Sequence, residues 1–340
     1  MAHEAERPDL EIRRATPDDR PAIIDLCRES LGWKQSDPNE EFFKWKHDRC
    51  PFGVSPAWIA VAPEGQIVGL RVFLRWEFRV AGGSQSLGSD RLTAVRAVDT
   101  ATHPDWQGKG IFTKLTLAAV EELKQDGLDV VFNTPNDQSR PGYLKMGWQV
   151  VGRIPVSVRV RSPMSAARLR GAKAAAGKWS SGTSAGIDAR TVLADKNALE
   201  RLLSSVPEPQ AIHTPRSANY YQWRYDFAPL GYRALPLGDI VEDGFIVFRV
   251  RTRGTATELT VCDVVAPRRA SVGTAVGHLL RSAKADYAIS TSNKALEAGP
   301  SKGFVPVRRL GPIMTWREVT RSGIPQMKDL GLTMGDVELF

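Results

Sequence analysis

One stretch sets the expectations for the rest of the chain: it reads His103-Pro-Asp-Trp-Gln-Gly-Lys-Gly-Ile-Phe-Thr-Lys-Leu115. The residues before it, Leu92 to Thr102, have the composition of a strand. After it, apolar residues recur at helical spacing: Ile111, Leu115, Ala118, Ala119 and Leu123. The pattern predicts a strand, a glycine loop and a helix, in that order.

The glycine loop has the features of an anion-binding site. It ends a strand and opens a helix, so backbone N–H groups of the first helical turn have no partner inside the helix and lie at the positive end of its dipole. Glycine permits a tight turn and the close approach of a phosphate, and Lys109 can add charge. We expect the residues from Gln107 to Gly110 to bind a diphosphate.

This loop resembles that of the GCN5-related N-acetyltransferase (GNAT) family. The family motif is Gln or Arg, two residues, Gly, one residue, then Gly or Ala. The chain fits it with Gln107, Gly108, Lys109, Gly110 and Ile111, whereas Phe112 stands where a small residue is usual. The resemblance covers residues 10 to 160.

A second signature of the family, an Asn followed by a Tyr and then Gly-Phe, is matched by Asn136, Tyr143 and Gly147-Trp148. In such enzymes the Tyr lies near the CoA sulfur and protonates the departing thiolate. The resemblance therefore implies that Tyr143 is the general acid, a task suited to a phenol with a pKa of about 10.

The same resemblance implies acetyl-CoA as the cosubstrate. Backbone groups of Thr100 to Thr102, at the end of a splayed strand, should pair with pantetheine and with the thioester carbonyl, where an N–H can stabilise an oxyanion. The residues expected to contact acetyl-CoA are Thr100, Ala101, Thr102, Gln107, Gly108, Lys109, Gly110, Ile111, Phe112, Thr113 and Asn136.

The second half of the chain repeats the first. Phe42-Phe-Lys-Trp-Lys-His-Asp-Arg-Cys-Pro-Phe-Gly53 aligns without a gap with Tyr220-Tyr-Gln-Trp-Arg-Tyr-Asp-Phe-Ala-Pro-Leu-Gly231. Later, Val95 to Pro104 resembles Leu259 to Pro267. The glycine loop is not repeated, because the stretch from Pro267 to His278 spaces its glycines differently. We infer a tandem duplication whose second copy no longer binds the cofactor.

The base that accepts a proton from the amine is the weakest assignment. Asp99, Glu41, Asp90, His47 and His103 are all possible by position, and so is a water relay. Asp99 is kept as the candidate. However, Asp263 stands at the matching place in the second copy, which favours a structural role common to both.

These patterns predict an α+β protein with two tandem GNAT-like domains, each a mixed, mainly antiparallel splayed sheet flanked by helices. The catalytic domain should span residues 1–160 and finish with one strand from Gln149 to Val160. A basic linker rich in Ala, Gly and Ser should follow at 161–188, the degenerate domain at 189–325 and a C-terminal tail at 326–340.

The net charge of +8 is concentrated in one segment. Between Ile154 and Ile187 there is no Asp or Glu, and the basic residues are Arg159, Arg161, Arg168, Arg170, Lys173 and Lys178. Without interleaved aromatic residues this segment does not indicate a specific nucleic-acid partner. If Met164 to Lys173 forms a basic helix, a weak contact with an anionic surface is possible.

The remaining composition points to a cytoplasmic protein. The N-terminus is charged, and no stretch of about 18 uncharged apolar residues follows, so neither secretion nor membrane spanning is expected. Cys27, Cys50 and Cys262 are scattered and there is no cluster of His, so neither disulfides nor a metal site is expected.

The expected activity is direct transfer of an acetyl group from acetyl-CoA to the primary amine of a small molecule, such as an amino sugar or an amino acid derivative. One alternative is an aminoacyl-tRNA-dependent aminoacyltransferase of the type that builds cell-wall cross-bridges, which does not need the CoA loop. Another is a non-catalytic module that binds CoA or a metabolite and regulates a partner. The sequence sets neither the acceptor nor the oligomeric state.

Overall fold

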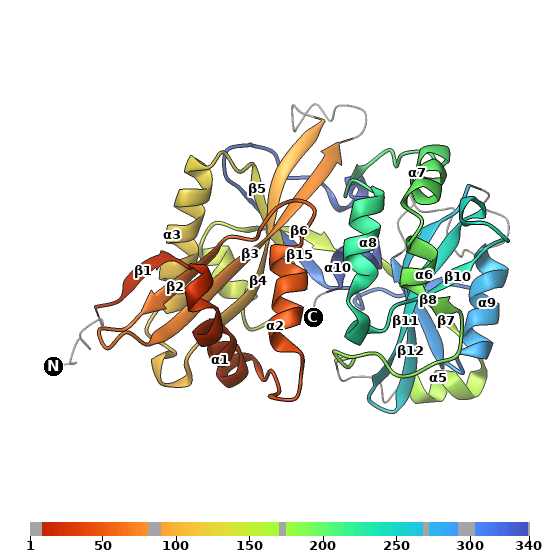
Figure 1. The fold of residues 1–340 in the computed structure, drawn as a ribbon, viewed down its shortest axis with the longest axis horizontal. Coiled ribbons are helices and arrows are strands. Elements are labelled where there is room, and N and C mark those ends of the chain that lie inside the picture. The colour runs from red at the N-terminus through yellow and green to blue at the C-terminus, as the bar shows by residue number, and fades with distance from the viewer. Residues whose placement is uncertain (1–8, 81–89, 170–174, 268–271, 292–302, 339–340) are drawn as a thin grey trace. The chain divides into compact units, whose positions relative to one another are not determined.

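The computed structural model describes residues 9–80, 90–169, 175–267, 272–291 and 303–338. The chain forms two compact units, and neither is one continuous stretch of sequence (Figure 1). The first unit comprises Met1–Glu77, Leu92–Val151 and Met314–Ile324. The second comprises Phe78–Arg91, Gly152–Ile313 and Pro325–Phe340.

The first sheet has the strand order β1-β2-β3-β4-β5-β15-β6, and β9 pairs with the end of β3. Its strands are β1 (Glu11–Arg14), β2 (Ala57–Val61), β3 (Ile67–Val80), β4 (Arg91–Thr102), β5 (Val130–Asn133), β6 (Gln149–Arg153), β9 (Ile212–His213) and β15 (Ile313–Glu318). The pairs β1/β2, β2/β3 and β5/β15 are antiparallel, whereas β4 and β5 are parallel. The expected mixed, mainly antiparallel sheet is confirmed.

The parallel strands β4 and β5 pair over only a short length. Ala94–Arg96 lie opposite Val130–Phe132. Because β5 ends at Asn133 and β4 continues to Thr102, the last residues of β4 extend beyond the end of β5. The main-chain groups at the end of β4 therefore have no pairing partner in β5.

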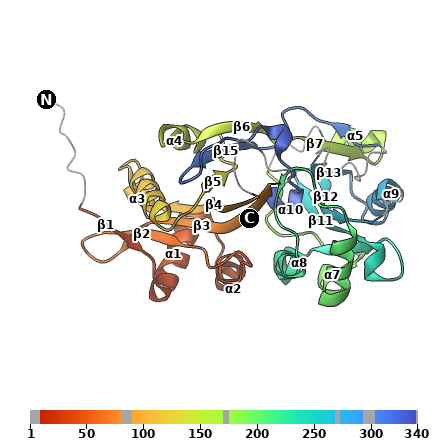
Figure 2. The same ribbon diagram turned by 90° about the horizontal axis from the view of Figure 1, so that it is seen from above.

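Helices cover both faces of the first sheet. They are η1 (Pro17–Asp19), α1 (Arg20–Leu31), α2 (Asn39–Phe43), which continues into the π-helical turn η2 (Lys44–Asp48), η3 (Pro104–Trp106), α3 (Ile111–Gln125) and α4 (Arg140–Lys145). Figure 2 shows α3 and α4 on one face and α1 and α2 on the other. The apolar stripe predicted for α3 packs against Trp58, Phe73 and Val95 of the core.

The close packing of α3 on β3 depends on Gly69. A Cβ at this position would lie 2.5 Å from Cγ2 of Ile111 and 2.9 Å from Cδ1 of Leu115, both buried side chains of α3. We expect Gly69→Ala to lower the free energy of unfolding by about 1–3 kcal/mol because it overpacks this contact. Urea denaturation measures the change, and Gly182→Ala, whose Cβ would have no atom within 4 Å, is the control. Equal stabilities of the two variants would contradict the prediction.

The second sheet has the strand order β14-β7-β13-β12-β11-β10-β8. Its strands are β7 (Val156–Val160), β8 (Ile187–Asp188), β10 (Arg233–Pro236), β11 (Phe245–Arg253), β12 (Ala256–Val265), β13 (Tyr287–Thr291) and β14 (Val305–Pro306). The helices of this unit include α5 (Pro163–Leu169), α6 (Ala189–Leu193), α7 (Lys196–Ser205), α8 (Ala218–Asp226), η4 (Ala228–Leu230), η5 (Val241–Asp243), α9 (Val272–Ser282), η7 (Met327–Asp329) and α10 (Met334–Val337).

The second unit repeats the plan of the first, as the internal repeat predicts. Its strands β12 and β13 are also parallel, and α9 lies between them in the chain as α3 lies between β4 and β5. One side-chain contact is also repeated: His47 contacts the carboxylate of Asp99, and the aligned Tyr225 donates to that of Asp263. The part of the second copy that replaces the glycine loop, residues 268–271, lies outside the described residues.

The prediction of a single strand from Gln149 to Val160 is wrong, because this segment forms two strands, β6 and β7. Pro155 lies at the break and has no N–H for a ladder hydrogen bond. The two parts also join different sheets: β6 is in the first, and β7 pairs with β13 in the second.

A strand from each half of the chain completes the sheet of the other half. β7 belongs to the second sheet, and β15 pairs with β5 in the first. The first compact unit therefore ends at Val151 in this part of the chain, whereas the expected domain boundary was at residue 160. The first unit also includes Met314–Ile324.

The described arginines of the basic segment have partners within the second unit. Arg159 donates to the carbonyl of Gly273 at 2.6 Å, and Arg161 and Arg168 lie 3.8 and 3.3 Å from the buried carboxylate of Asp286. Arg170 and Lys173 lie outside the described residues. These three arginines have partners inside the protein, and a contact of this segment with an anionic surface stays a prediction.

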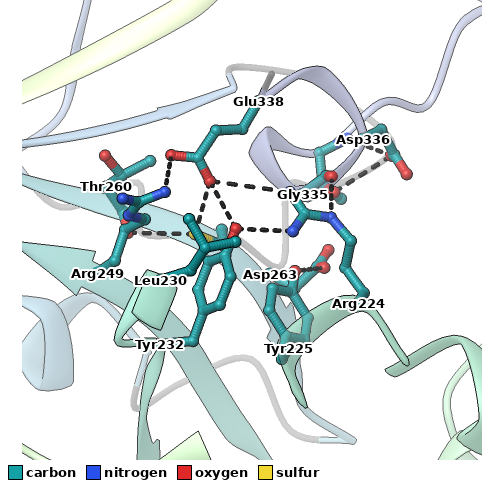
Figure 3. Close-up of polar contacts among 12 residues, drawn as sticks. Arg224, Tyr225, Leu230, Tyr232, Arg249, Thr260, Asp263, Gly335, Asp336 and Glu338 are labelled. Carbon is teal, nitrogen blue, oxygen red and sulfur yellow. Dashed lines mark hydrogen bonds and ion pairs between the residues drawn. The ribbon is translucent and has the colours of Figure 1, made fainter. Parts of the chain in front are cut away.

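The C-terminal tail is held in the second unit by buried ion pairs (Figure 3). Glu338 accepts from Arg249 at 3.2 Å and from the hydroxyl of Tyr232 at 3.0 Å, and Arg224 donates to the Gly335 carbonyl at 2.8 Å. The Asp336 carboxylate lies 2.7 Å from Arg216. The tail thus forms part of the interior of this unit as far as Glu338.

Candidate active site

The glycine loop opens a helix that has no side-chain cap. Gly108 and Gly110 have φ angles of 77° and 78°, a left-handed conformation that glycine adopts without strain. Gly110 is the N-cap of α3 and makes no side-chain cap hydrogen bond. A Cβ on either glycine would have no atom within 4 Å, so the loop is open on this side. This conformation is compatible with an anion at the N–H groups of the loop, and the binding itself stays a prediction.

The other loop residues support this conformation. Gln107 reaches back to donate to the carbonyl of Thr102 at 3.4 Å, and the Nζ of Lys109 lies 4.4 Å from the centre of the Trp106 ring. Thr113 is exposed. The side chain of Ile111 is buried, with 2% exposed, so Ile111 can contact a ligand only through its backbone N–H. The loop thus presents main-chain donors, with Lys109 as the nearby cation.

Tyr143 and Phe112 are in contact. Tyr143, on α4, is 4% exposed, and its ring lies 5.3 Å from that of Phe112 in an edge-to-face arrangement. Phe112 fits because Gly142 has no side chain: a Cβ there would lie 3.0 Å from the Phe112 ring. No described residue forms a hydrogen bond with the Tyr143 hydroxyl. The predicted acid therefore lies next to the first turn of α3 with its hydroxyl available to a substrate.

Asn136 forms the turn that precedes α4. Its Oδ1 accepts from the N–H of Ser139 at 2.8 Å and from the hydroxyl of the same residue at 2.9 Å. This is the turn-forming use of an Asn side chain. Asn136 thereby fixes the start of the segment that carries Tyr143, and its contact with the cofactor stays a prediction.

Asp99 lies in a buried ionic cluster. Its Oδ2 is 2.8 Å from Nζ of Lys46 and 2.7 Å from Nε2 of His47, and all three side chains are at most 6% exposed. Burial alone would raise the pKa of Asp99, but the charge of Lys46 and the hydrogen bond from His47 hold it well below its usual range. Such a carboxylate stays ionised and is a poor proton acceptor, so the structure favours a positioning role for Asp99.

Successive side chains at the end of β4 contact titratable residues on opposite faces of the first sheet. Asp99 has a φ of 40°, unusual for a residue other than glycine, and its side chain meets Lys46 and His47 next to α2. The neighbouring Thr100 accepts from Arg71 on the face of Tyr143. Ala101 is 2% exposed and Thr102 accepts from Ser30. The predicted strand residues thus lie between the two groups of titratable side chains.

The buried His47 predicts a pH dependence of stability. Burial lowers its pKa below 6.5, and the bond to Asp99 offsets this only in part. The unfolded state then binds the proton more readily, so stability falls as the pH drops below about 6.5, by up to about 1.4 kcal/mol per pH unit. We expect His47→Gln to flatten the decline between about pH 6.5 and 5 in urea denaturation, whereas His103→Gln should not. A decline unchanged by His47→Gln would contradict this.

Sequence reasoning missed Arg71. It is 0% exposed at the centre of β3, where Gly69, Arg71 and Phe73 face α3 and α4. The available signal was a charged residue within the otherwise uncharged, mainly apolar run from Ile67 to Leu74. Its neighbours Thr100, Phe112 and Tyr143 are all predicted site residues.

The described residues contain no group of three or more His, Cys, Asp or Glu side chains that could hold a metal ion. None of their helices is long and apolar enough to cross a membrane.

Residues 11–151 match the family model of the acetyltransferase (GNAT) domain. Residues 11–151 therefore form a GNAT acetyltransferase domain, which confirms the resemblance seen in the loop and around Tyr143. A search of curated protein sequences finds no match.

Several solved structures are similar to the whole chain. A conserved protein of Enterococcus faecalis V583, described as a probable N-acyltransferase, is 11% identical with a TM-score of 0.63, over 92% of this chain and 72% of the other. A GCN5-related N-acetyltransferase from Anabaena variabilis is 13% identical, with a TM-score of 0.61 over 92% and 73%. A putative acetyltransferase from Pyrococcus horikoshii is 14% identical, with a TM-score of 0.52 over 99% and 98%. At these identities the likeness shows the fold.

Proposed function

We propose that the first unit transfers an acyl group, with acetyl as the simplest case, from its CoA thioester to the primary amine of a small molecule. The observation that carries this proposal is the uncapped N-terminus of α3, which follows the open glycine loop and contacts Tyr143 through Phe112. The loop supplies main-chain donors for the diphosphate of CoA. Tyr143, whose ring contacts Phe112 of the first turn of α3, supplies a hydroxyl that can donate a proton.

The proposed chemistry is a direct transfer. The neutral amine attacks the thioester carbonyl carbon, and main-chain N–H groups at the end of β4 stabilise the oxyanion. When the C–S bond breaks, the thiolate takes the proton of the Tyr143 hydroxyl. The amine nitrogen loses one proton, which returns to the phenolate through solvent. The products are an amide and the free thiol of CoA.

We propose His47, on the opposite face of the sheet, as the group that passes the proton of the amine to solvent. Its lowered pKa keeps it neutral near pH 7, and the bond between Nε2 and ionised Asp99 places the ring proton on Nε2. Nδ1 then has its lone pair; it is buried, and no described residue binds it. The arrangement has the carboxylate–imidazole order in which a buried acid orients a base. Asp99 thus acts as the positioning residue.

The glycine loop and Tyr143 also distinguish this proposal from the two alternatives. An aminoacyltransferase that uses aminoacyl-tRNA would not need a loop built for a diphosphate, and the conformation of Gly108 and Gly110 therefore favours a CoA donor. A non-catalytic module would not need the available hydroxyl of Tyr143. Both remain outcomes of the test.

The test is release of CoA thiol, followed with a colorimetric reagent, from acetyl-CoA and a panel of amino sugars and amino acid derivatives. We expect amine-dependent thiol release. Tight acetyl-CoA binding without release for any amine would favour the non-catalytic module, and no binding of acetyl-CoA or of any other acyl-CoA thioester would overturn the proposal.

A further inference from the structure

Arg71 is a buried cation without an anionic partner. It is 0% exposed, and it takes part in none of the ion pairs found within the described part of the chain. Its Nη1 donates to the hydroxyl of Thr100. Its Nε and Nη2 are buried without a hydrogen-bond partner among the described residues.

Aromatic rings surround the guanidinium. Its Cζ lies 4.6 Å from the ring centre of Phe73, 5.2 Å from that of Tyr143 and 5.6 Å from that of Phe112. Ring faces attract a cation, which offsets part of the cost of burying it. They cannot accept the two in-plane N–H bonds of Nε and Nη2, and unpaired buried donors on a charged group are costly.

The two free nitrogens form a geometric pair. Nε–H and Nη2–H point the same way from one edge of the planar guanidinium, while Nη1 on the other edge is taken by Thr100. Two parallel N–H donors match the two oxygens of a carboxylate, and such bidentate pairs are among the strong charge-assisted contacts. A neutral carbonyl would satisfy the bonds but leave the charge unpaired.

The position of Arg71 indicates which molecule would bring a carboxylate to it. Thr100, Tyr143 and Phe112 around it belong to the proposed donor site, whereas His47 and Asp99 lie on the opposite face. A group that reaches Arg71 therefore arrives with the acyl donor. Phe112 is only partly buried, so its ring is the part of the cover that can turn aside when the donor enters.

We propose that Arg71 binds a terminal carboxylate on the acyl group, so that the preferred donor is a short dicarboxylic acyl-CoA. This inference rests on the proposed function. The carboxylate takes no part in bond changes: the amine nitrogen bonds to the thioester carbonyl carbon, the C–S bond breaks, CoA leaves as the thiol, and the amide product keeps the free carboxylate. Acetyl-CoA in the same site leaves Nε and Nη2 unpaired and is the poorer donor.

The test compares the affinities of succinyl-CoA, malonyl-CoA and acetyl-CoA by isothermal titration calorimetry. We expect the wild-type protein to bind at least one dicarboxylic thioester about tenfold to a hundredfold more tightly than acetyl-CoA. Arg71→Met should abolish this preference, so that the dicarboxylic thioesters bind the variant no more tightly than acetyl-CoA does. Because it removes an unpaired buried charge, the variant should be at least as stable as the wild type in the absence of ligand.

Two further variants separate the role of the two N–H groups from that of charge and packing. Arg71→Lys keeps the charge but loses the paired donors, and should retain only part of the preference. Arg14→Met removes another arginine stacked on a core ring, 5.0 Å from the centre of Trp58, and should keep the preference intact.

The outcomes distinguish this inference from the proposed function. If the wild-type protein binds acetyl-CoA as tightly as both dicarboxylic thioesters, the role of Arg71 is overturned while the acyltransferase proposal stands. A preference that survives in Arg71→Met also overturns it. If none of the three thioesters binds, the proposed function fails and the inference fails with it.

Discussion

Replacing Tyr143 by phenylalanine is expected to lower kcat for acyl transfer by a factor of about 10² to 10⁴, the usual contribution of a general acid. The ring and its contacts with Phe112 and Trp148 remain, so the core should be preserved. Only the hydroxyl that protonates the departing thiolate is lost. The dissociation constant of acetyl-CoA should therefore change little.

The measurement is steady-state thiol release together with the affinity for acetyl-CoA. Tyr221→Phe in the second unit is the control, because Tyr221 is also a buried aromatic residue, 3% exposed, but lies outside the proposed site. Wild-type kcat in Tyr143→Phe would remove Tyr143 from the mechanism. A parallel loss of affinity and kcat would instead assign it to binding.

Gly110→Asp is expected to weaken acetyl-CoA binding by about tenfold to a hundredfold relative to Gly110→Asn. Asn and Asp both tolerate the left-handed conformation of this position, and a Cβ there has open space, so both variants should fold. They differ mainly in one negative charge. At about 5 Å and an effective dielectric constant of about 20, two like charges repel by about 3 kcal/mol, which solvent at this exposed loop reduces.

Calorimetric titration with acetyl-CoA at low and high salt measures this difference. The gap between the two variants should narrow as the salt concentration rises, because the repulsion is screened. Equal affinities at low salt would mean that the diphosphate does not lie at the N-terminus of α3.

The local elements could be predicted because their signals are local. The strand before the loop and the helix from Ile111 both follow from periodicity and from the glycines of the loop. The pairing of β15 with β5 and of β7 with β13 could not, because a strand's pattern shows which face is buried and not which distant strand lies beside it.

The site could be predicted where a main-chain motif defines it. The loop from Gln107 to Gly110 and the candidate Tyr143 follow from the family motifs, and in the structure Phe112, just after the loop, contacts Tyr143. The state of Asp99 depends on Lys46 and His47, which are about 50 residues away in the chain. The role of Arg71 depends on three rings from β3, α3 and α4. Side-chain partners of this kind are set by the tertiary fold.

The most direct test of acyl transfer by the first unit is mass spectrometry of an amine library incubated with the protein and acetyl-CoA. We predict that at least one primary amine gains the mass of one acetyl group, and that this product is strongly reduced with Tyr143→Phe. If no amine is acetylated by a protein that binds acetyl-CoA, or if acylation requires an aminoacyl-tRNA as donor, the proposed activity is wrong.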